Sequence, residues 1–160
     1  MAASSVKVVD KGATALLRAM RSMDGSVTSR VGVFGEKAKA QHNDDAISNG
    51  ALAAVHEFGV GVPERSFVRG WVDQSKPEIV SQLKATATAV ASGKGTIYQG
   101  MHRFGQWGDL AMVKRITAHI PPPLSPVTVA RKGHAVPLVE TGELLRSIDS
   151  AVERNEQVVK

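Results

Sequence analysis

Apolar and polar residues alternate along three short segments of the chain, which is the pattern of a strand with one buried face. The alternation is clearest over residues 26–34, where β-branched side chains dominate, and over 148–152 near the other end. A shorter alternation at 4–9 indicates one further strand. The sequence therefore predicts two or three strands that lie far apart along the chain.

Apolar side chains spaced three and four residues apart predict four or five helical segments in the rest of the chain. The first is expected to start after Asp10 and to end before Gly25. Asn49 is predicted to cap the next helix and Gly59 to stop it, while the polar, aperiodic residues 36–48 indicate an exposed loop. The apolar face expected for this helix consists of Ala51, Ala54, Val55 and Phe58.

The apolar stripe that runs through residues 66–91 is compatible with two arrangements. Either a new helix starts at Ser75, with Glu78 completing a capping box, or one longer helix is kinked there. A last long helix is expected from about residue 97 until the prolines at 121–123 terminate it. Three glycines are expected to weaken this helix: Gly100, Gly105 and Gly108.

Residues 118–148 form a long, proline-punctuated connection with few regular elements. Ser125 and Pro126 predict the start of a short helix that Gly133 ends, and Thr141 is expected to cap a second short turn. Connections of this length inside a compact domain tend to be functional or to be interaction arms. We therefore expect this connection to be an extended arm that takes part in the function of the protein.

Together these elements favour an α+β fold, because helices are grouped between strands that lie near the two ends. We expect a small antiparallel or mixed sheet of two to four strands, packed by four or five helices and followed by a long, proline-rich C-terminal arm. The 160 residues fit a single domain spanning 1–160, with 118–148 as its arm. The chain has no cysteine, which excludes disulfides and thiolate metal sites.

The charge of the chain is mildly basic, with 20 Lys and Arg against 15 Asp and Glu. Most basic residues are spread singly, which favours an ordinary basic surface over a nucleic-acid-binding face. In the cluster at 130–134, Arg131 and Lys132 complement a helix end, and a contact of the same side chains with DNA or a partner is compatible with this role. No apolar run approaches the roughly 20 residues of a membrane span and no signal peptide is recognised, so we expect a soluble protein.

No motif supplies the residues that catalysis or cofactor binding requires. The His-Glu pair at 56–57 lacks the second histidine of a zinc motif, since that position is Val60. The SGKGT segment at 92–96 lacks the glycine spacing of a phosphate loop, and the Asp pair at 44–45 lacks the further oxygen ligands of a calcium loop. A G-x-S-x-G nucleophile elbow is missing as well. We therefore expect no enzyme activity, no cofactor and no metal.

Two segments resemble one family of structural proteins. HEFGVGVPERSFVRGWVD at 56–73 is similar to the "EFG…P.RPFLR.A" signature of tail-completion and neck proteins of long-tailed bacteriophages, which include minor-tail-protein-Z-like, tail-terminator-like and Mu-like virion morphogenesis groups. IPPPLSPVTVARKGHAVPLVETGELLRSI at 120–148 resembles the "PLSP.T…KG…PL.DTG.L..SI" signature of the same proteins, and the order and spacing agree. The chain departs from the family at Ser66, Gly70 and Glu140.

The resemblance implies a ring-forming subunit, six-fold in symmetry, that caps the finished tail tube and joins it to the head connector. Its implied partners are further copies of itself, the tail tube protein and the head–tail connector or adaptor, with DNA passing through and no membrane involved. Its implied location is the neck of the virion, after assembly in the host cytoplasm. The residues we expect at assembly interfaces are Phe67, Trp71, Leu124, Val127, Arg131, Lys132, Leu138, Leu144 and Leu145.

Other functions remain open at the level of the sequence. A minor tail protein at another tail position would carry the same signatures. The positive charge would suit a DNA-binding or packaging accessory protein, whose binding would weaken steeply with salt. A small hydrolase would need a pocket in which histidine, serine and carboxylate side chains converge.

Overall fold

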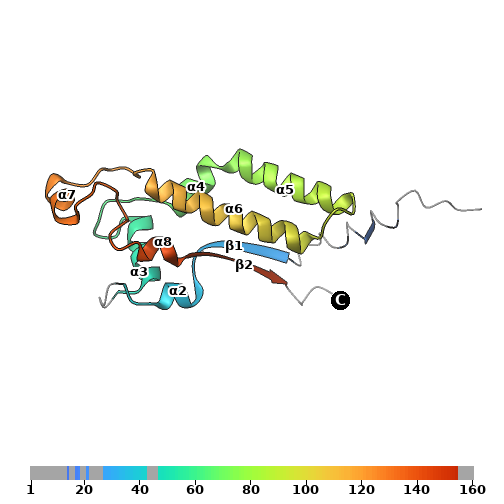
Figure 1. Ribbon diagram of the computed structural model, residues 1–160, viewed down its shortest axis with the longest axis horizontal. Coiled ribbons are helices and arrows are strands. Elements are labelled where there is room, and N and C mark those ends of the chain that lie inside the picture. Colours follow the sequence, from blue (N-terminus) through green and yellow to red (C-terminus); the bar gives the residue numbers. More distant parts are fainter. Residues whose placement is uncertain (1–13, 15–16, 19–20, 22–26, 43–46, 155–160) are drawn as a thin grey trace, which may run out of the picture.

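The computed structural model describes residues 14, 17–18, 21, 27–42 and 47–154 of the chain. Over these residues the protein is a mixed α+β structure with seven helices and a two-stranded antiparallel sheet (Figure 1), which confirms the α+β class and adds helices to the four or five expected. The elements are β1 (Val27–Val33), α2 (Gly35–Lys39), α3 (Asn49–Phe58), α4 (Val68–Gln74), α5 (Lys76–Ala91), α6 (Ile97–Thr117), α7 (Pro126–Lys132), α8 (Glu143–Ser147) and β2 (Ile148–Arg154).

Some of the sequence predictions lie wholly or mostly outside the described residues. They are the strand at 4–9, most of the helix after Asp10 and the C-terminal tail. Of that helix, Thr14, Leu17, Arg18 and Arg21 are described, and all four are helical and exposed.

The sheet joins two segments from distant parts of the sequence. β1 and β2 pair antiparallel along their whole length, from Val27 opposite Arg154 to Val33 opposite Ile148. Both strands lie where the alternating pattern predicts them. α6 packs across both strands, and α5 packs on the side of α6 that faces away from the sheet (Figure 1). The two strands therefore lie at the bottom of a three-layer stack in which α6 is the middle layer.

The glycines of α6 let this helix approach its neighbours closely. A Cβ atom at Gly105 would lie 2.9 Å from the Cβ of Ser150 in β2, and one at Gly108 would lie 2.9 Å from a methyl group of Val31 in β1. At Gly100 the side chain of Thr86 from α5 occupies the space that a Cβ atom would need. From the sequence we expected these glycines to weaken the helix. In the structure each of them lies in close contact with another element, where a larger residue would not fit.

The hydrophobic core lies between α6, the sheet and the segments that flank α4 and α8. Phe67, Met112 and Ile116 are fully buried, and the rings of Trp71 and Trp107 pack with their centroids 5.7 Å apart. The other members of the buried cluster come from several elements: Ala53, Ile120, Leu144 and Ile148.

The prediction that residues 118–148 form an extended arm is not confirmed, because both ends of this segment pack into the core. Ile120 and Ile148 near its ends belong to the core, as does Leu144, which is 2% exposed. The middle of the segment, residues 121–136, carries α7 at one far end of the molecule (Figure 1), and no residue of α7 is buried. We refer to residues 121–136 as the protruding segment. As predicted, Ser125 caps α7 and Gly133 ends it in the left-handed conformation.

Several predictions about α2 and α3 are wrong. Residues 36–48 are not a simple loop, because α2 occupies their first part and Gln41 pairs with Ser48 in an isolated bridge. Ser48, not Asn49, caps α3, and its hydroxyl accepts a hydrogen bond from Ala51 N. The side chain of Asn49 instead turns inward, where it donates to the carbonyl of Lys37 and contacts His42.

The inner face of α3 also differs from its expected apolar face. Ala51, Ala54 and Phe58 are exposed and Val55 is half-buried, whereas the buried residues are Asn49, Ala53 and Glu57. Polar side chains are buried here because they satisfy polar groups of neighbouring segments, and apolar periodicity does not report such contacts.

The stripe over 66–91 forms two successive helices that meet at Ser75. The predicted capping box is not formed there, because the side chain of Ser75 makes no capping hydrogen bond. A capping box is present instead at the start of α6, between Thr96 and Gln99. Along α5 the apolar stripe is covered only toward the C-terminal end: Val80 and Leu83 are exposed at 48% and 40%, whereas Val90 is buried.

We predict that Gly105→Leu lowers the free energy of unfolding by at least about 2 kcal/mol, because the new side chain would be forced against both strands. Gln106→Leu on the neighbouring, exposed position of α6 is the matched control and should change it by less than about 0.5 kcal/mol. Chemical denaturation measures both. Equal stability of the two variants would contradict the close packing of α6 on the sheet.

Candidate functional site

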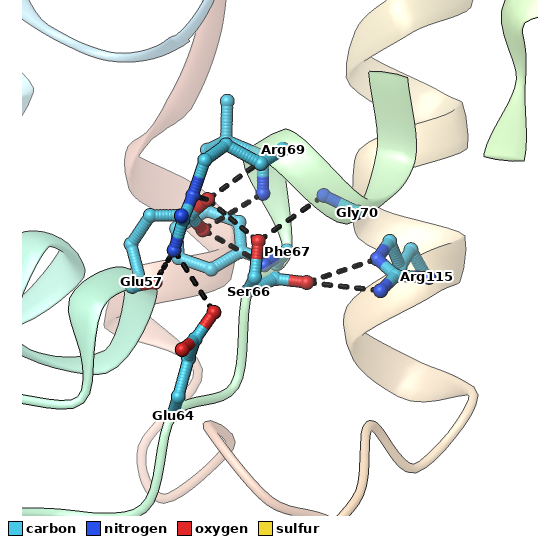
Figure 2. A network of polar contacts seen from close by, with 8 residues as sticks. Glu57, Glu64, Ser66, Phe67, Arg69, Gly70 and Arg115 are labelled. Atoms are coloured by element: carbon cyan, nitrogen blue, oxygen red, sulfur yellow. Dashed lines mark hydrogen bonds and ion pairs between the residues drawn. The ribbon is translucent and has the colours of Figure 1, made fainter. Parts of the chain in front are cut away.

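The carboxylate of Glu57, near the end of α3, is hydrogen-bonded to the start of α4 (Figure 2). Gly59 ends α3 in the left-handed conformation, which reverses the chain and brings the start of α4 back to Glu57. The carboxylate then accepts hydrogen bonds from the backbone N–H groups of Phe67, Val68 and Arg69, at 2.8, 3.0 and 2.9 Å. It therefore acts as a cap for α4, supplied from another helix, and satisfies three donors that have no partner within α4.

Further polar groups complete this Glu57 network. The hydroxyl of Ser66 donates to Glu57 at 2.7 Å, and Arg69 Nε donates to the same carboxylate at 3.1 Å. The other end of the Arg69 guanidinium bonds the Glu57 carbonyl and Glu64, and it lies 4.8 Å from the ring centre of Phe58. Arg69 thereby covers the outside of the buried carboxylate.

The pKa of Glu57 is lowered by these hydrogen bonds. Burial alone would raise the pKa of this carboxyl group, but the donors from Arg69, Val68 and Ser66 outweigh burial because they bind the ionised form. Glu57 is therefore a charged, hydrogen-bonded structural group rather than a proton donor near neutral pH.

Two arginines connect this network to the rest of the fold. Arg115 of α6 donates from Nε and Nη2 to the Ser66 carbonyl at 3.2 and 2.9 Å. Arg65 donates from Nε and Nη2 to the Pro122 carbonyl at 3.1 and 2.9 Å. Gly70 leaves the space that the Arg115 guanidinium occupies, since a Cβ atom there would overlap it. The segments 56–73 and 120–148 are thus joined directly through Arg65.

A pocket of about 710 Å³ lies beside this junction, between α3 and the protruding segment. We call it the basic pocket. Its polar lining includes five basic residues and one acidic residue: His42, His56, Arg65, Arg131, Lys132 and Glu140. Its apolar lining includes Leu52, Val62, Leu124 and Leu138.

The basic residues of this pocket influence one another. The pKa of His56 is lowered, first by burial and then by the charges of Arg65, Lys132 and His42. The pKa of Lys132 is also lowered by burial, and the nearby Arg131 and Arg65 act in the same direction against the opposing effect of Glu140. The pocket is therefore a region of concentrated positive charge.

The basic pocket also contains the hydroxyl groups of Ser125 and Thr128. Ser125 Oγ accepts from Thr128 N and contacts the Thr128 hydroxyl at 2.9 Å, as a helix cap does. Among the described residues, no hydrogen bond joins Ser125 to His42 or His56. A second polar cluster pairs the Ser150 hydroxyl with Asp109 at 2.7 Å, and burial raises the pKa of Asp109.

The predicted interface residues fall into three groups. Phe67, Trp71 and Leu144 are buried in the core of the chain itself, so in this fold they are not available as a surface. Leu145 packs partly buried against that core, and Val127 is 80% exposed on α7. The remaining four all line the basic pocket: Leu124, Arg131, Lys132 and Leu138, of which Leu138 also packs against the core.

The sequence reasoning missed the roles of Glu57, Arg65 and Ser66. The only local signal is the spacing of the motif: a glutamate ends one helix, and an arginine and a serine precede the next. The pairing of Glu57 with donors about ten residues away depends on the chain reversal at Gly59, which periodicity does not reveal.

No family model matches the chain, and comparisons with curated proteins and with solved structures found no match either. Within the part of the chain that the structure describes, no three histidine or carboxylate side chains gather as a metal site would require. The helices described there also include none with the length and apolar character of a membrane span.

We predict that Glu57→Gln lowers the free energy of unfolding by on the order of 3 kcal/mol at neutral pH, because several N–H and O–H donors lose their charged acceptor. Glu64→Gln, at a carboxylate that is 57% exposed and also contacts Arg69, is the control and should cost less than about 1 kcal/mol.

A comparison of wild type with Glu57→Gln at several pH values tests the charge of Glu57. Since the folded-state pKa of Glu57 lies below the ordinary value of 4.5, its stabilisation is complete above that pH and is lost as the pH falls through the lowered folded pKa. The stability difference between wild type and Glu57→Gln should therefore shrink below about pH 4.5. A difference that stays constant down to pH 2 would argue against a charged Glu57 as the cap of α4.

Proposed function

We propose that this protein is a non-enzymatic structural subunit of the neck of a long-tailed bacteriophage, a ring-forming tail-completion or tail-terminator protein. It caps the tail tube and joins it to the head connector. The sequence basis is the resemblance of residues 56–73 and 120–148 to two signatures of that family.

The observation that supports this proposal best is the direct contact between the two segments that carry the resemblance. They lie far apart in the sequence, yet Arg65 of the first bonds the Pro122 carbonyl of the second. Arg115 of α6, which lies between them in the sequence, bonds Ser66 of the first segment as well. If the two resemblances were accidental, a direct contact between the two segments would not be expected. If both segments belong to one family fold, such a contact is expected.

The chemistry of the side chains also favours a structural role. The most strongly hydrogen-bonded carboxylate, Glu57, has its acceptor positions occupied by backbone and side-chain donors, and Ser125 is occupied as a cap. Binding surfaces, in contrast, are available. Val127 projects from the protruding segment, and Leu110 on α6 is 73% exposed.

Ring closure requires a head-to-tail contact in which one surface of a subunit meets a different surface of the next copy. The protruding segment is suited to be one of these surfaces. It lies at one end of the molecule, α7 buries none of its residues within the chain, and Val127 is an apolar side chain exposed to 80%. In the ring, Val127 would be buried against the neighbouring subunit.

We predict that Val127→Asp leaves the fold intact and abolishes ring assembly, because it places a charge where an apolar contact forms. The free energy of unfolding should change by less than about 0.5 kcal/mol. Complementation of a phage that lacks this protein, scored as joined heads and tails, measures function. Size-exclusion chromatography with light scattering measures assembly.

Val60→Asp is the matched control, since Val60 is 64% exposed in the turn after α3 and lies outside the protruding segment. It should support normal joining. Normal joining by Val127→Asp, or equal loss in both variants, would speak against the protruding segment as the assembly surface. A packaging or DNA-binding role would instead appear as duplex binding that weakens steeply with salt.

A further inference from the structure

The basic pocket contains a buried cation, Arg65, for which the described residues supply no acidic partner. Arg65 is 6% exposed, and both of its side-chain hydrogen bonds go to one backbone carbonyl, that of Pro122. Among the described residues, no carboxylate forms an ion pair with it. Buried charges in proteins are ordinarily paired, since desolvation without a counter-charge is costly.

His56 also lines this pocket. Its Nδ1 is buried and has no hydrogen-bond partner within the part of the chain that is described. Its surroundings are cationic: Arg65, Lys132 and His42 each disfavour the protonated form. An anionic group beside His56 would offset these charges and accept a hydrogen bond from the ring.

The acidic groups of the described residues balance this charge only in part. Glu140 lines the pocket and opposes the lowering of the Lys132 pKa. Glu143 lies 3.3 Å from His42, which lines the pocket. Against these two carboxylates stand three basic side chains, Arg65, Arg131 and Lys132.

We propose that the basic pocket binds a carboxylate-bearing side chain from an acidic peptide segment of a partner protein. Lys132 and Arg131 attract the carboxylate, His56 donates to it, and Leu52, Val62 and Leu124 contact an adjacent apolar residue of the peptide. This binding role goes beyond the neck function and does not depend on it, since it rests only on the composition and charge of the pocket.

The shape of the pocket favours an acidic peptide over duplex DNA. Its volume of about 710 Å³ lies within the roughly 300–1,000 Å³ typical of pockets that enclose a small ligand. Its cations converge on one partly buried space and are not spread along a surface that could follow a phosphate backbone. The apolar lining suits a side chain next to the carboxylate, as in a peptide.

The test uses the full-length chain and two capped peptides, acetyl-Leu-Glu-Asp-Leu-amide and its neutral analogue acetyl-Leu-Gln-Asn-Leu-amide. NMR titration at pH 7 and constant ionic strength measures both dissociation constants and the shift of the His56 ring signals. We expect the acidic peptide to bind at least about tenfold more tightly than the neutral analogue, because its carboxylates accept charge-assisted hydrogen bonds. We also expect the pKa of His56 to rise on binding.

Lys132→Met removes the charge and keeps an apolar stem, and it should weaken binding of the acidic peptide by about tenfold or more. Lys84→Met, at an exposed position on α5, is the control and should bind as wild type does. Arg131→Met provides a second variant at an exposed position, so that a folding defect in one protein does not decide the result.

Three results would overturn the proposal. The first is equal affinity for the acidic and neutral peptides. The second is unchanged binding in both Lys132→Met and Arg131→Met. The third is a tenfold gain in affinity for the acidic peptide when Asp44 and Asp45 are both changed to asparagine. Such a gain would mean that these carboxylates of the same chain normally occupy the pocket. Tight duplex DNA binding that displaces the peptide would assign the pocket to nucleic acid instead.

Discussion

The carboxylate of Glu57 lies where three parts of the chain meet. It caps α4 through three backbone N–H groups and accepts from Ser66 and Arg69. Because α4 begins at this carboxylate, Phe67 and Trp71 are directed into the core against α6. The same junction presents the Ser66 carbonyl to Arg115 and carries Arg65, which holds the base of the protruding segment through Pro122. The buried carboxylate of Glu57 therefore lies at the contact between the core, the α3–α4 turn and the segment that we propose for assembly.

The second constraint is the close approach of α6 to a sheet of only two strands. An isolated two-stranded ribbon is marginally stable in water, so β1 and β2 need a partner that buries one face. Gly105 and Gly108 allow the α6 backbone to lie directly on that face. Since β2 follows α8 in the chain, this packing also fixes the far end of the 118–148 segment. With both of its ends held, the middle of the segment is free to project.

Local patterns in the sequence predicted the elements whose causes are local. The alternating residues of β1 and β2 and the caps Ser125 and Gly133 of α7 lie where expected. The helix α3 also lies where expected, and Gly59 ends it. The prediction of its inner face was wrong, because Phe58 lies outside, beneath the Arg69 guanidinium, whereas Glu57 lies inside on donors from α4. The basic pocket could not be predicted either, because its cations come from residues 42 to 132 and only the folded chain brings them together. Charges spread singly along a sequence can still meet in space.

These features together describe a small protein with a packed core and one segment at its end that buries few of its side chains, which suits the binding role that we propose. The central claim is that copies of this chain form the ring that ends the tail and joins it to the head. Electron microscopy of the intact particle that contains this protein tests the claim most directly. The account predicts a closed ring of these subunits at the junction of head and tail, with residues 121–136 in the contact between neighbouring copies. Density for the protein at the tail tip or inside the capsid, or particles that lack it altogether, would contradict the account.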